Sequence, residues 1–449
     1  MTPLSGSRRR FLQSAGFGGI GLFWQQSLGR IAAAAGAKPD GTAKSVILIF
    51  NCGAPSHIDL WDLKPNATDT VRGLYKPIST SAPGIQISEL LPDLARHAHR
   101  FSIIRSVHHT HASHNSGMHW SIVGRPYRMD STLINPSRGD MPSFGTLTGW
   151  LAQRDGNTGP LPPYVITPSP HCDSTVYLTP GQFGGCLGPA YDPLVLNADP
   201  NAANFSVPNL APMEEIAPQR QVERQALLGQ LGQCGVPVLA AGSDDFEIHR
   251  AKALSMMGSS AARDAFNLNL ESPALRDRYG RHTWGQSHLL ARRLVEAGVR
   301  FVTTVNGQSI VWDTHKDNFN RMEKSLVPPM ERAFSTLLDD LVERGLLDST
   351  LVIWMGDFGR TPIINAEAGR DHWPQCYSMV MAGGGIRGGQ VIGESDSTGA
   401  FPKSRPIRPA DVHATVFSAL GYNAREITYH MADGRPMLLS DGDVIRELL

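Results

Sequence analysis

The sequence has little net charge, few cysteines and no long apolar run. Lys and Arg together number 41, and so do Asp and Glu, so the 449-residue chain carries no formal net charge. Because no net positive field draws such a chain to a polyanion, nucleic-acid binding is excluded as its main role. The five cysteines are widely spaced and form no CxxC pair, which excludes a zinc knuckle and a CxxC redox motif.

Glycine-rich nucleotide-binding motifs are also missing. The glycine run GGGIRGG at residues 383–389 lacks the spacing of a dinucleotide fingerprint that follows a strand and opens a helix, so we interpret it as turn backbone. Glycine (45 residues) and proline (32 residues) are nevertheless abundant, which indicates long loops between sharply periodic segments. The composition is that of a loop-rich globular protein.

The first 37 residues predict an export signal peptide. They combine a charged start, a short apolar stretch interrupted by glycine, and small residues at positions 35–37 that suit a signal peptidase. Residues 7–13, SRRRFLQ, match the twin-arginine pattern, so we expect the twin-arginine export machinery as a partner and a periplasmic or extracellular location. An uncleaved anchor stays open as an alternative, although the apolar stretch is shorter than the ~20 residues that a spanning helix needs.

Apolar runs and helical patterns alternate along residues 38–449, which we expect to form a single domain. Strands are predicted at residues 44–50, 101–106, 299–305, 350–355 and 377–382, and helices at 88–97, 283–297 and 329–344. The alternation is typical of an α/β fold with a mostly parallel sheet and helices on both faces. Residues from about 126 to 237 are rich in Pro, Gly, Asn and Ser, and we expect a loop-rich insertion over the sheet or its edge.

Side chains that can bind a metal follow the predicted strands. In an open parallel sheet, ligands bind beyond the carboxyl ends of the strands. Asp313 and His315 come after the strand at 299–305, and Asp357 directly follows the strand at 350–355, with His372 further along the same loop. Asp and His supply the ligands that zinc, manganese and iron accept, so these four residues predict a divalent metal site. The alternatives are structural hydrogen bonds and a turn cap at Asp357.

Two arginines lie in the same loop as Asp357. Arg360 and Arg370 suit bidentate contacts with the oxygens of a phosphoryl or sulfuryl group, and we predict that they bind the anion during catalysis. The alternative is that they pair with nearby carboxylates, such as those of Glu367 and Asp371, and bind no ligand.

Histidines are concentrated between residues 108 and 119, in the run HHTHASHNSGMH. Five histidines in twelve residues are too dense for a chance set of core residues, so at least one is expected to act in the site. A surface histidine run is the alternative. The pattern does not choose among the five.

These segments together resemble a known family. The stretches KSVILIFNCGAPSHIDLWDLKP, RSVHHTHASH, WDTHKDNF, LVIWMGDFGRTP and GRDHWP resemble the DUF1501 family of exported bacterial proteins, which is placed in the alkaline phosphatase and sulfatase-like superfamily. The resemblance implies a helix-flanked sheet with one or two metal ions at the strand ends. By position, Asp313 and His315 resemble the first aspartate-histidine pair, Asp357 the aspartate of the later pair, and His372 the lone histidine that follows.

The resemblance also implies a nucleophile at the start of a helix, and His114 and Ser116 are the candidates at that position. Two residues depart from the superfamily pattern. Asn51 stands where the first strand ends in a metal-binding aspartate, and Phe358 stands where a second histidine follows Asp357. The Cys-x-Pro-Ser-Arg motif of sulfatases is absent, so formylglycine chemistry is not implied.

The expected function is that of an exported, metal-dependent hydrolase of phosphate or sulfate esters. The ion would be zinc, manganese, iron or calcium, and the substrate an anionic ester such as a sulfated or phosphorylated glycan. The alternative, motivated by Asn51 and Phe358, is a non-catalytic envelope or polysaccharide-associated protein that keeps the fold with a degenerate site.

Overall fold

The computed structural model describes residues 41–156, 159–172, 177–207, 252–307 and 309–449, together with residues 220, 223, 226 and 227. The predicted export signal lies outside the described residues, as does most of the predicted insertion beyond residue 207. Within the described ranges, no helix is both long and apolar enough to cross a membrane.

An eight-stranded mixed sheet forms the centre of the fold. Its strands are β1 (Ser45–Asn51), β4 (Phe101–Val107), β5 (Tyr164–Thr167), β6 (Leu194–Val195), β7 (Phe301–Asn306), β8 (Thr350–Gly356), β11 (Tyr377–Ala382) and β12 (Gln390–Ile392). They are ordered β12-β4-β11-β8-β1-β7-β5-β6. Each strand is parallel to its neighbours except β11, which runs antiparallel to both β4 and β8. The prediction of a mostly parallel sheet is therefore confirmed.

Both faces of the central strand β1 are buried. All seven of its residues are buried, as expected for an apolar run in a parallel sheet covered on both sides. Ile47 and Ile49 pack into one hydrophobic core, whereas Val46, Leu48 and Phe50 pack into the other. The sheet thus separates two cores, each covered by its own layer of helices.

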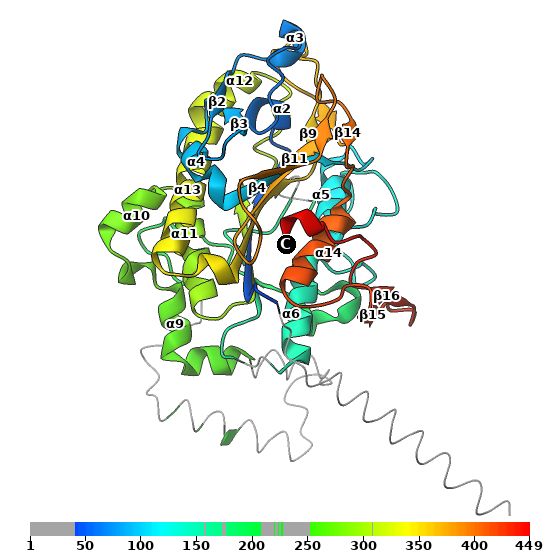
Figure 1. Ribbon diagram of the computed structural model, residues 1–449. Coiled ribbons are helices and arrows are strands. Elements are labelled where there is room, and N and C mark those ends of the chain that lie inside the picture. Colours follow the sequence, from blue (N-terminus) through cyan, green and yellow to red (C-terminus); the bar gives the residue numbers. More distant parts are fainter. Residues whose placement is uncertain are drawn as a thin grey trace, which may run out of the picture.

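The helices form a layer on each face of the sheet (Figure 1). The first layer contains α4 (Pro92–His97), α9 (Ser260–Phe266), α10 (Pro273–Tyr279), α11 (Thr283–Glu296) and α13 (Val327–Glu343). The second contains α5 (His114–Val123), α6 (Phe144–Arg154) and α14 (Pro409–Ala419). In α13, Phe334, Leu337, Leu338 and Leu341 are fully buried, as their helical spacing predicts.

Short elements complete the fold. They are the helices α2 (His57–Leu60), α3 (Asp69–Arg72) and α12 (Asn318–Arg321), and the strand pairs β2 (Pro77–Ser79) with β3 (Gln86–Ser88), β9 (Gly359–Arg360) with β10 (His372–Trp373), β13 (Glu394–Ser395) with β14 (Pro402–Ser404), and β15 (Thr428–His430) with β16 (Pro436–Leu438). α2, α3, α12 and β9 lie at the upper end of the view in Figure 1, beyond the carboxyl end of β1. This end of the sheet carries the candidate site.

The predicted insertion contributes to the sheet itself. Residues 164–167 form β5, which pairs with β7, and residues 194 and 195 form β6 at the sheet edge. The same region also contains α6. β5 was missed because its four residues lie between prolines in LPPYVITP, and so short an apolar run carries little periodic signal. The expected loops therefore include two strands that widen the sheet.

Candidate metal centre

Three neighbouring strands bring the site together. β1 pairs in parallel with β7 and with β8, and Asn51 lies beside both Asn306 and Gly356, so the three strands end at the same level. Asp357 follows β8 directly and is fully buried. Its Oδ1 accepts hydrogen bonds from the amides of Gly53, at 3.0 Å, and Ala54, at 2.8 Å, in the turn after β1.

The other oxygen of Asp357 holds His114, the first residue of α5. The distance from His114 Nδ1 to Asp357 Oδ2 is 2.5 Å. On the other side of the ring, Nε2 is buried and has no hydrogen-bond partner among the described residues. Burial alone would lower the pKa of His114, but the carboxylates of Asp357 and Asp313 raise this pKa to about 9. Asp357 therefore fixes the ring and leaves Nε2 facing the site.

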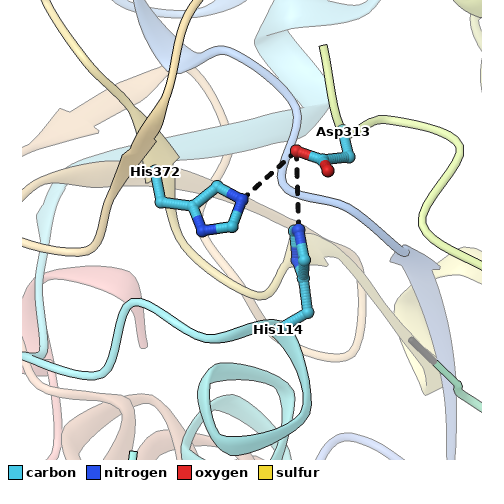
Figure 2. Close-up of side chains that lie close together, drawn as sticks. All are labelled: His114, Asp313 and His372. Atoms are coloured by element: carbon cyan, nitrogen blue, oxygen red, sulfur yellow. Dashed lines mark hydrogen bonds and ion pairs between the residues drawn. The ribbon is translucent and has the colours of Figure 1, made fainter. Parts of the chain in front are cut away.

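Asp313 lies where the imidazoles converge (Figure 2). Its Oδ1 is 3.5 Å from His114 Nε2 and 3.2 Å from His372 Nε2, and the three ligand atoms all lie within 4.8 Å of one another. Burial alone would raise the pKa of the Asp313 carboxyl, but the two imidazoles and the Arg360 guanidinium hold it well below its usual range. Asp313 is thus held as a carboxylate.

His315 adds a third imidazole to this group. Its Nε2 is 3.0 Å from Asp313 Oδ1 and 3.0 Å from His372 Nε2. Its Nδ1 is 2.5 Å from Asp371 Oδ1, and His372 Nδ1 is 2.6 Å from the carbonyl oxygen of Ala112. We call His114, Asp313, His315 and His372 the histidine cluster.

The three imidazoles of the histidine cluster share one arrangement. Each Nδ1 faces an oxygen acceptor that can hold its proton, and each Nε2 faces Asp313, so the Nε2 atoms are the ones that would give a lone pair to an ion in place of a proton. An anchored Nδ1–H with a free Nε2 is how histidine ligands are held in metal sites. Donors about 2.1 Å from a tetrahedral ion lie about 3.4 Å apart, close to the spacing between Asp313 and the imidazoles. His114, Asp313 and His372, whose ligand atoms all lie within 4.8 Å of one another, therefore fit a divalent ion, and His315 lies beside them at 3.0 Å from Asp313 Oδ1.

Arg360 is fully buried beside the histidine cluster and contacts Asp313. One terminal nitrogen is 2.6 Å from Asp313 Oδ1 and also donates to the carbonyl of Gly53. Its Nε donates to the carbonyl of Ala54 at 2.9 Å, and its second terminal nitrogen donates to that of Arg370 at 3.1 Å. These bonds use its donors within the protein, so Arg360 orients Asp313.

Arg370 makes a different buried pair. Its Nε and one terminal nitrogen lie 2.8 Å and 3.0 Å from the two carboxylate oxygens of Asp59, a bidentate geometry. The remaining donors contact the carbonyls of Val71, Thr361 and Pro362. Both loop arginines therefore pair with a carboxylate, which was the alternative to anion binding. The partners are Asp313 and Asp59 rather than Glu367 and Asp371.

Ser116 lies on the first turn of α5, but its hydroxyl is directed to Asp130. The Ser116 Oγ donates to Asp130 Oδ1 at 2.6 Å. The same carboxylate accepts from the amides of Ala112 and Ser113, both at 2.9 Å, and so stabilises the start of the helix. Of the two nucleophile candidates, the structure brings His114 to the cluster and gives Ser116 a partner outside it.

The two departures from the superfamily pattern have structural roles. Asn51 donates to the carbonyl of Met355 and accepts from Asn306, each at 3.0 Å, so its amide is used within the sheet. The ring of Phe358 stacks on His114 with centroids 5.1 Å apart and lies 4.9 Å from the ring of His372. An apolar ring therefore covers one side of the histidine cluster.

A family model matches residues 43–449 under the description "Protein of unknown function (DUF1501)". The chain belongs to the DUF1501 family. The match takes in β1, α5 and all four members of the histidine cluster. A comparison of the DUF1501 chain with curated proteins finds no match.

Solved structures similar to this DUF1501 chain share little sequence with it. A protein of the alkaline phosphatase superfamily from Vibrio parahaemolyticus is 10% identical, with 88% of this chain and 76% of that chain covered and a TM-score of 0.40. The PsFucS1 sulfatase from Pseudoalteromonas sp. is 14% identical, with 93% and 75% covered and a TM-score of 0.36. The phosphonate monoester hydrolase SpPMH from Silicibacter pomeroyi is 13% identical, with 90% and 76% covered and a TM-score of 0.36. The function must therefore be argued from the site of this chain.

Proposed function

We propose that the protein is a metal-dependent hydrolase of anionic phosphate or sulfate esters, with the histidine cluster as the ligand set of one divalent ion. The observation that carries this proposal is the buried Nε2 of His114, which has no hydrogen-bond partner among the described residues and lies 3.5 Å from Asp313 Oδ1 while Asp357 holds Nδ1. A buried polar atom left without a partner is costly, so a ligand is expected there.

The donor set favours a transition metal. Imidazole nitrogen with one carboxylate suits zinc, manganese or iron, whereas calcium takes oxygen ligands. Such an ion, when bound, supplies Lewis acidity to an ester oxygen and to an attacking water. The chain's own side chains hold the ligands: Asp357 keeps the proton of His114 on Nδ1, Asp371 does the same for His315, and Arg360 orients Asp313.

The surroundings of the cluster favour one ion over two. Asn51 uses its amide within the sheet, and Phe358 stacks on His114, so neither offers a ligand for a second ion. Asp357 accepts two backbone hydrogen bonds and the His114 proton, which makes it a support for a ligand rather than a ligand itself. We therefore replace Asp357 with His114 in the ligand set that the sequence predicted.

The location and the substrate remain part of the same proposal. The twin-arginine pattern at residues 7–13 supports export to the periplasm or beyond. An anionic ester on a glycan is a substrate that an exported hydrolase would meet. In this proposal His114 is a metal ligand and not a nucleophile, and the hydroxyl of Ser116 is hydrogen-bonded to Asp130. Water is therefore the group that attacks the ester.

The test combines metal content with turnover. The mature protein, exported through its own signal, is loaded with zinc, manganese or iron, and assayed with 4-nitrophenyl esters of phosphate and sulfate. We expect hydrolysis that is lost in His114→Ala and His372→Ala and kept in His288→Ala, a buried histidine of α11 whose Nδ1 contacts the carbonyl of Trp284. If metal-loaded protein hydrolyses none of these esters, or if both ligand variants stay active, the proposal fails in favour of a binding protein.

A further inference from the structure

The backbone carbonyl of Asp357 accepts hydrogen bonds from two side chains. His109 Nε2 lies 2.7 Å from this oxygen, and the Ser121 hydroxyl donates to it at 3.0 Å. His109 lies in the loop between β4 and α5, and Ser121 is on α5 itself. A carbonyl oxygen only accepts, so the His109 ring carries a proton on Nε2 and donates it to Asp357. Asp357 is therefore held through its main chain as well as through its carboxylate.

The ring of His109 is itself fixed in place. It is buried and stacks on Trp120, with centroids 5.2 Å apart and an interplanar angle of 16°. The ring of Tyr377 meets it edge-on at 5.5 Å, and its backbone amide donates to the carbonyl of Pro374 at 2.9 Å. Burial lowers the pKa of His109 to about 4, so the ring is neutral at pH 7 and its single ring proton is the one donated to Asp357. The donor is thus held in one orientation.

Two routes of contact lead from His109 to His114. The first passes through Asp357, whose carbonyl binds His109 and whose Oδ2 lies 2.5 Å from His114 Nδ1. The second passes through Phe358, whose ring meets His109 edge-on at 6.3 Å and stacks on His114 at 5.1 Å. A change at the His109 ring is therefore transmitted to His114, although His109 is not a member of the histidine cluster.

We propose that His109 is a positioning residue of the metal centre, which fixes the backbone of Asp357 and thereby the carboxylate that holds His114. This inference rests on the proposed function and adds a residue that lies behind the ligands. Without the His109 donor, the carbonyl of Asp357 keeps only the hydroxyl of Ser121. Because the orientation of a ligating imidazole depends on its outer partners, a looser Asp357 weakens the binding of an ion at His114.

Two substitutions of His109 and one matched control separate positioning from packing. His109→Leu removes the donor and keeps apolar bulk, whereas His109→Gln keeps an amide donor at a similar reach. The control is His413→Leu, because His413 is also buried, with its Nε2 2.8 Å from the carbonyl of Ser121 and its ring stacked on Phe144 at 4.3 Å. His413 makes the same kinds of contact as His109, but with a carbonyl other than that of Asp357.

The first readout is the affinity for zinc, measured by competition with a chromophoric chelator. Loss of a direct outer partner costs about 10- to 100-fold, and His109 acts one contact further out, so we expect a loss of about three- to thirtyfold in His109→Leu. His109→Gln and His413→Leu should bind zinc as wild type does, while denaturant unfolding shows both leucine variants to be similarly destabilised. Wild-type affinity in His109→Leu, or an equal loss in His109→Gln or His413→Leu, overturns the inference.

The second readout needs no metal and follows the His114 Nδ1 proton by NMR in the metal-free protein. This proton lies in a 2.5 Å contact with Asp357, so its resonance is expected far downfield, and its loss in His114→Ala assigns it. We expect its exchange with water to become about tenfold faster in His109→Leu and to stay unchanged in His413→Leu. Ser121→Ala removes the other donor to the same carbonyl with little change in volume, and should speed exchange in the same direction. If neither His109→Leu nor Ser121→Ala changes the exchange rate, the inference is wrong.

Failure of the inference and failure of the proposed function are separable by these two readouts. If the protein takes up no zinc, the proposed metal centre falls, and the exchange of the His114 proton alone decides whether His109 positions Asp357. If zinc binds and esters are hydrolysed, but His109→Leu matches wild type in affinity and in proton exchange, the positioning role falls and the proposed function stands.

Discussion

Asp357 holds the ring of His114, the proposed metal ligand, through its Nδ1. The substitution Asp357→Asn tests this role without removing a ligand. In the protein the carboxylate accepts from the amides of Gly53 and Ala54 and holds the proton on His114 Nδ1. An asparagine keeps one carbonyl oxygen for the two amides but turns its NH₂ group toward His114. Nδ1 must then accept, so the ring proton moves to Nε2, the atom that is needed for the ion.

The expected effect is a weaker metal site in a folded protein. Loss of an outer partner of a ligating histidine typically costs 10- to 100-fold in metal affinity, equivalent to about 1.4–2.7 kcal/mol. The affinity is measured by competition with a chromophoric chelator, for wild type and variant under the same buffer. Circular dichroism and thermal unfolding without metal show whether the variant is folded.

Asp59→Asn is the matched control for this experiment. Both carboxylates are buried, with 0% exposure for Asp357 and 1% for Asp59, and both substitutions remove a charged acceptor. Asp59 pairs with Arg370 and accepts from Asn318, and neither partner belongs to the histidine cluster. Unchanged metal affinity in Asp357→Asn, or an equal loss in Asp59→Asn, would refute the assignment of Asp357 as the support of His114.

Four further outcomes are expected. Gly117→Ala should lower the free energy of unfolding by about 1–3 kcal/mol in denaturant titration, because the new Cβ would lie 2.7 Å from the Phe358 ring; an unchanged midpoint would contradict this packing. Arg370→Leu should cost about 3–5 kcal/mol by leaving a buried carboxylate unpaired, yet bind metal as wild type does; loss of the metal would place it in the site after all. Ser116→Ala should keep any ester hydrolysis, because its hydroxyl is bonded to Asp130, and a loss of turnover with metal bound would restore it as the nucleophile. Burial raises the pKa of Glu331 to about 7, so the folded protein resists ionisation of this side chain more than the unfolded chain does. The free energy of unfolding of the wild type should therefore fall by about 1–2 kcal/mol between pH 4.5 and 7.5, and that of Glu331→Gln should fall by less. Parallel curves of unfolding free energy against pH would contradict the shift.

The sequence predicted the sheet well where the apolar runs are long. β1, β7 and β8 each differ by at most two residues at either end from the predicted strands, because buried parallel strands are continuous apolar runs. The antiparallel direction of β11 was not predictable, because a buried apolar run such as Tyr377–Ala382 carries no signal for strand direction. β5 was too short to be recognised.

The structure brings some of the residues proposed for the site together and separates others, while their roles stay predictions. Asp313, His315 and His372 are brought together, because the loops after β7 and β8 meet at one edge of the sheet. His114 was one of five histidines in a run, and only its place at the start of α5 singles it out. The roles of Asp357 and Asp371 depend on which ring nitrogen they contact, and no sequence pattern encodes this.

The arginines show a second limit of sequence reasoning. An arginine that is exposed beside a metal and an arginine that is buried and hydrogen-bonded to carbonyls can follow a strand in the same sequence pattern. Arg360 and Arg370 were expected to bind an anion, whereas their donors contact backbone carbonyls and the carboxylates of Asp313 and Asp59. The density of carbonyl acceptors around them follows from tight turns that only the folded chain reveals.

The most direct test of the central claim is the metal content per chain of the mature protein, purified without chelator. The account predicts close to one zinc, manganese or iron per chain, reduced to background in His114→Ala and His372→Ala and unchanged in His288→Ala. A folded protein that contains no metal, and takes none up on titration with these three ions, would contradict it.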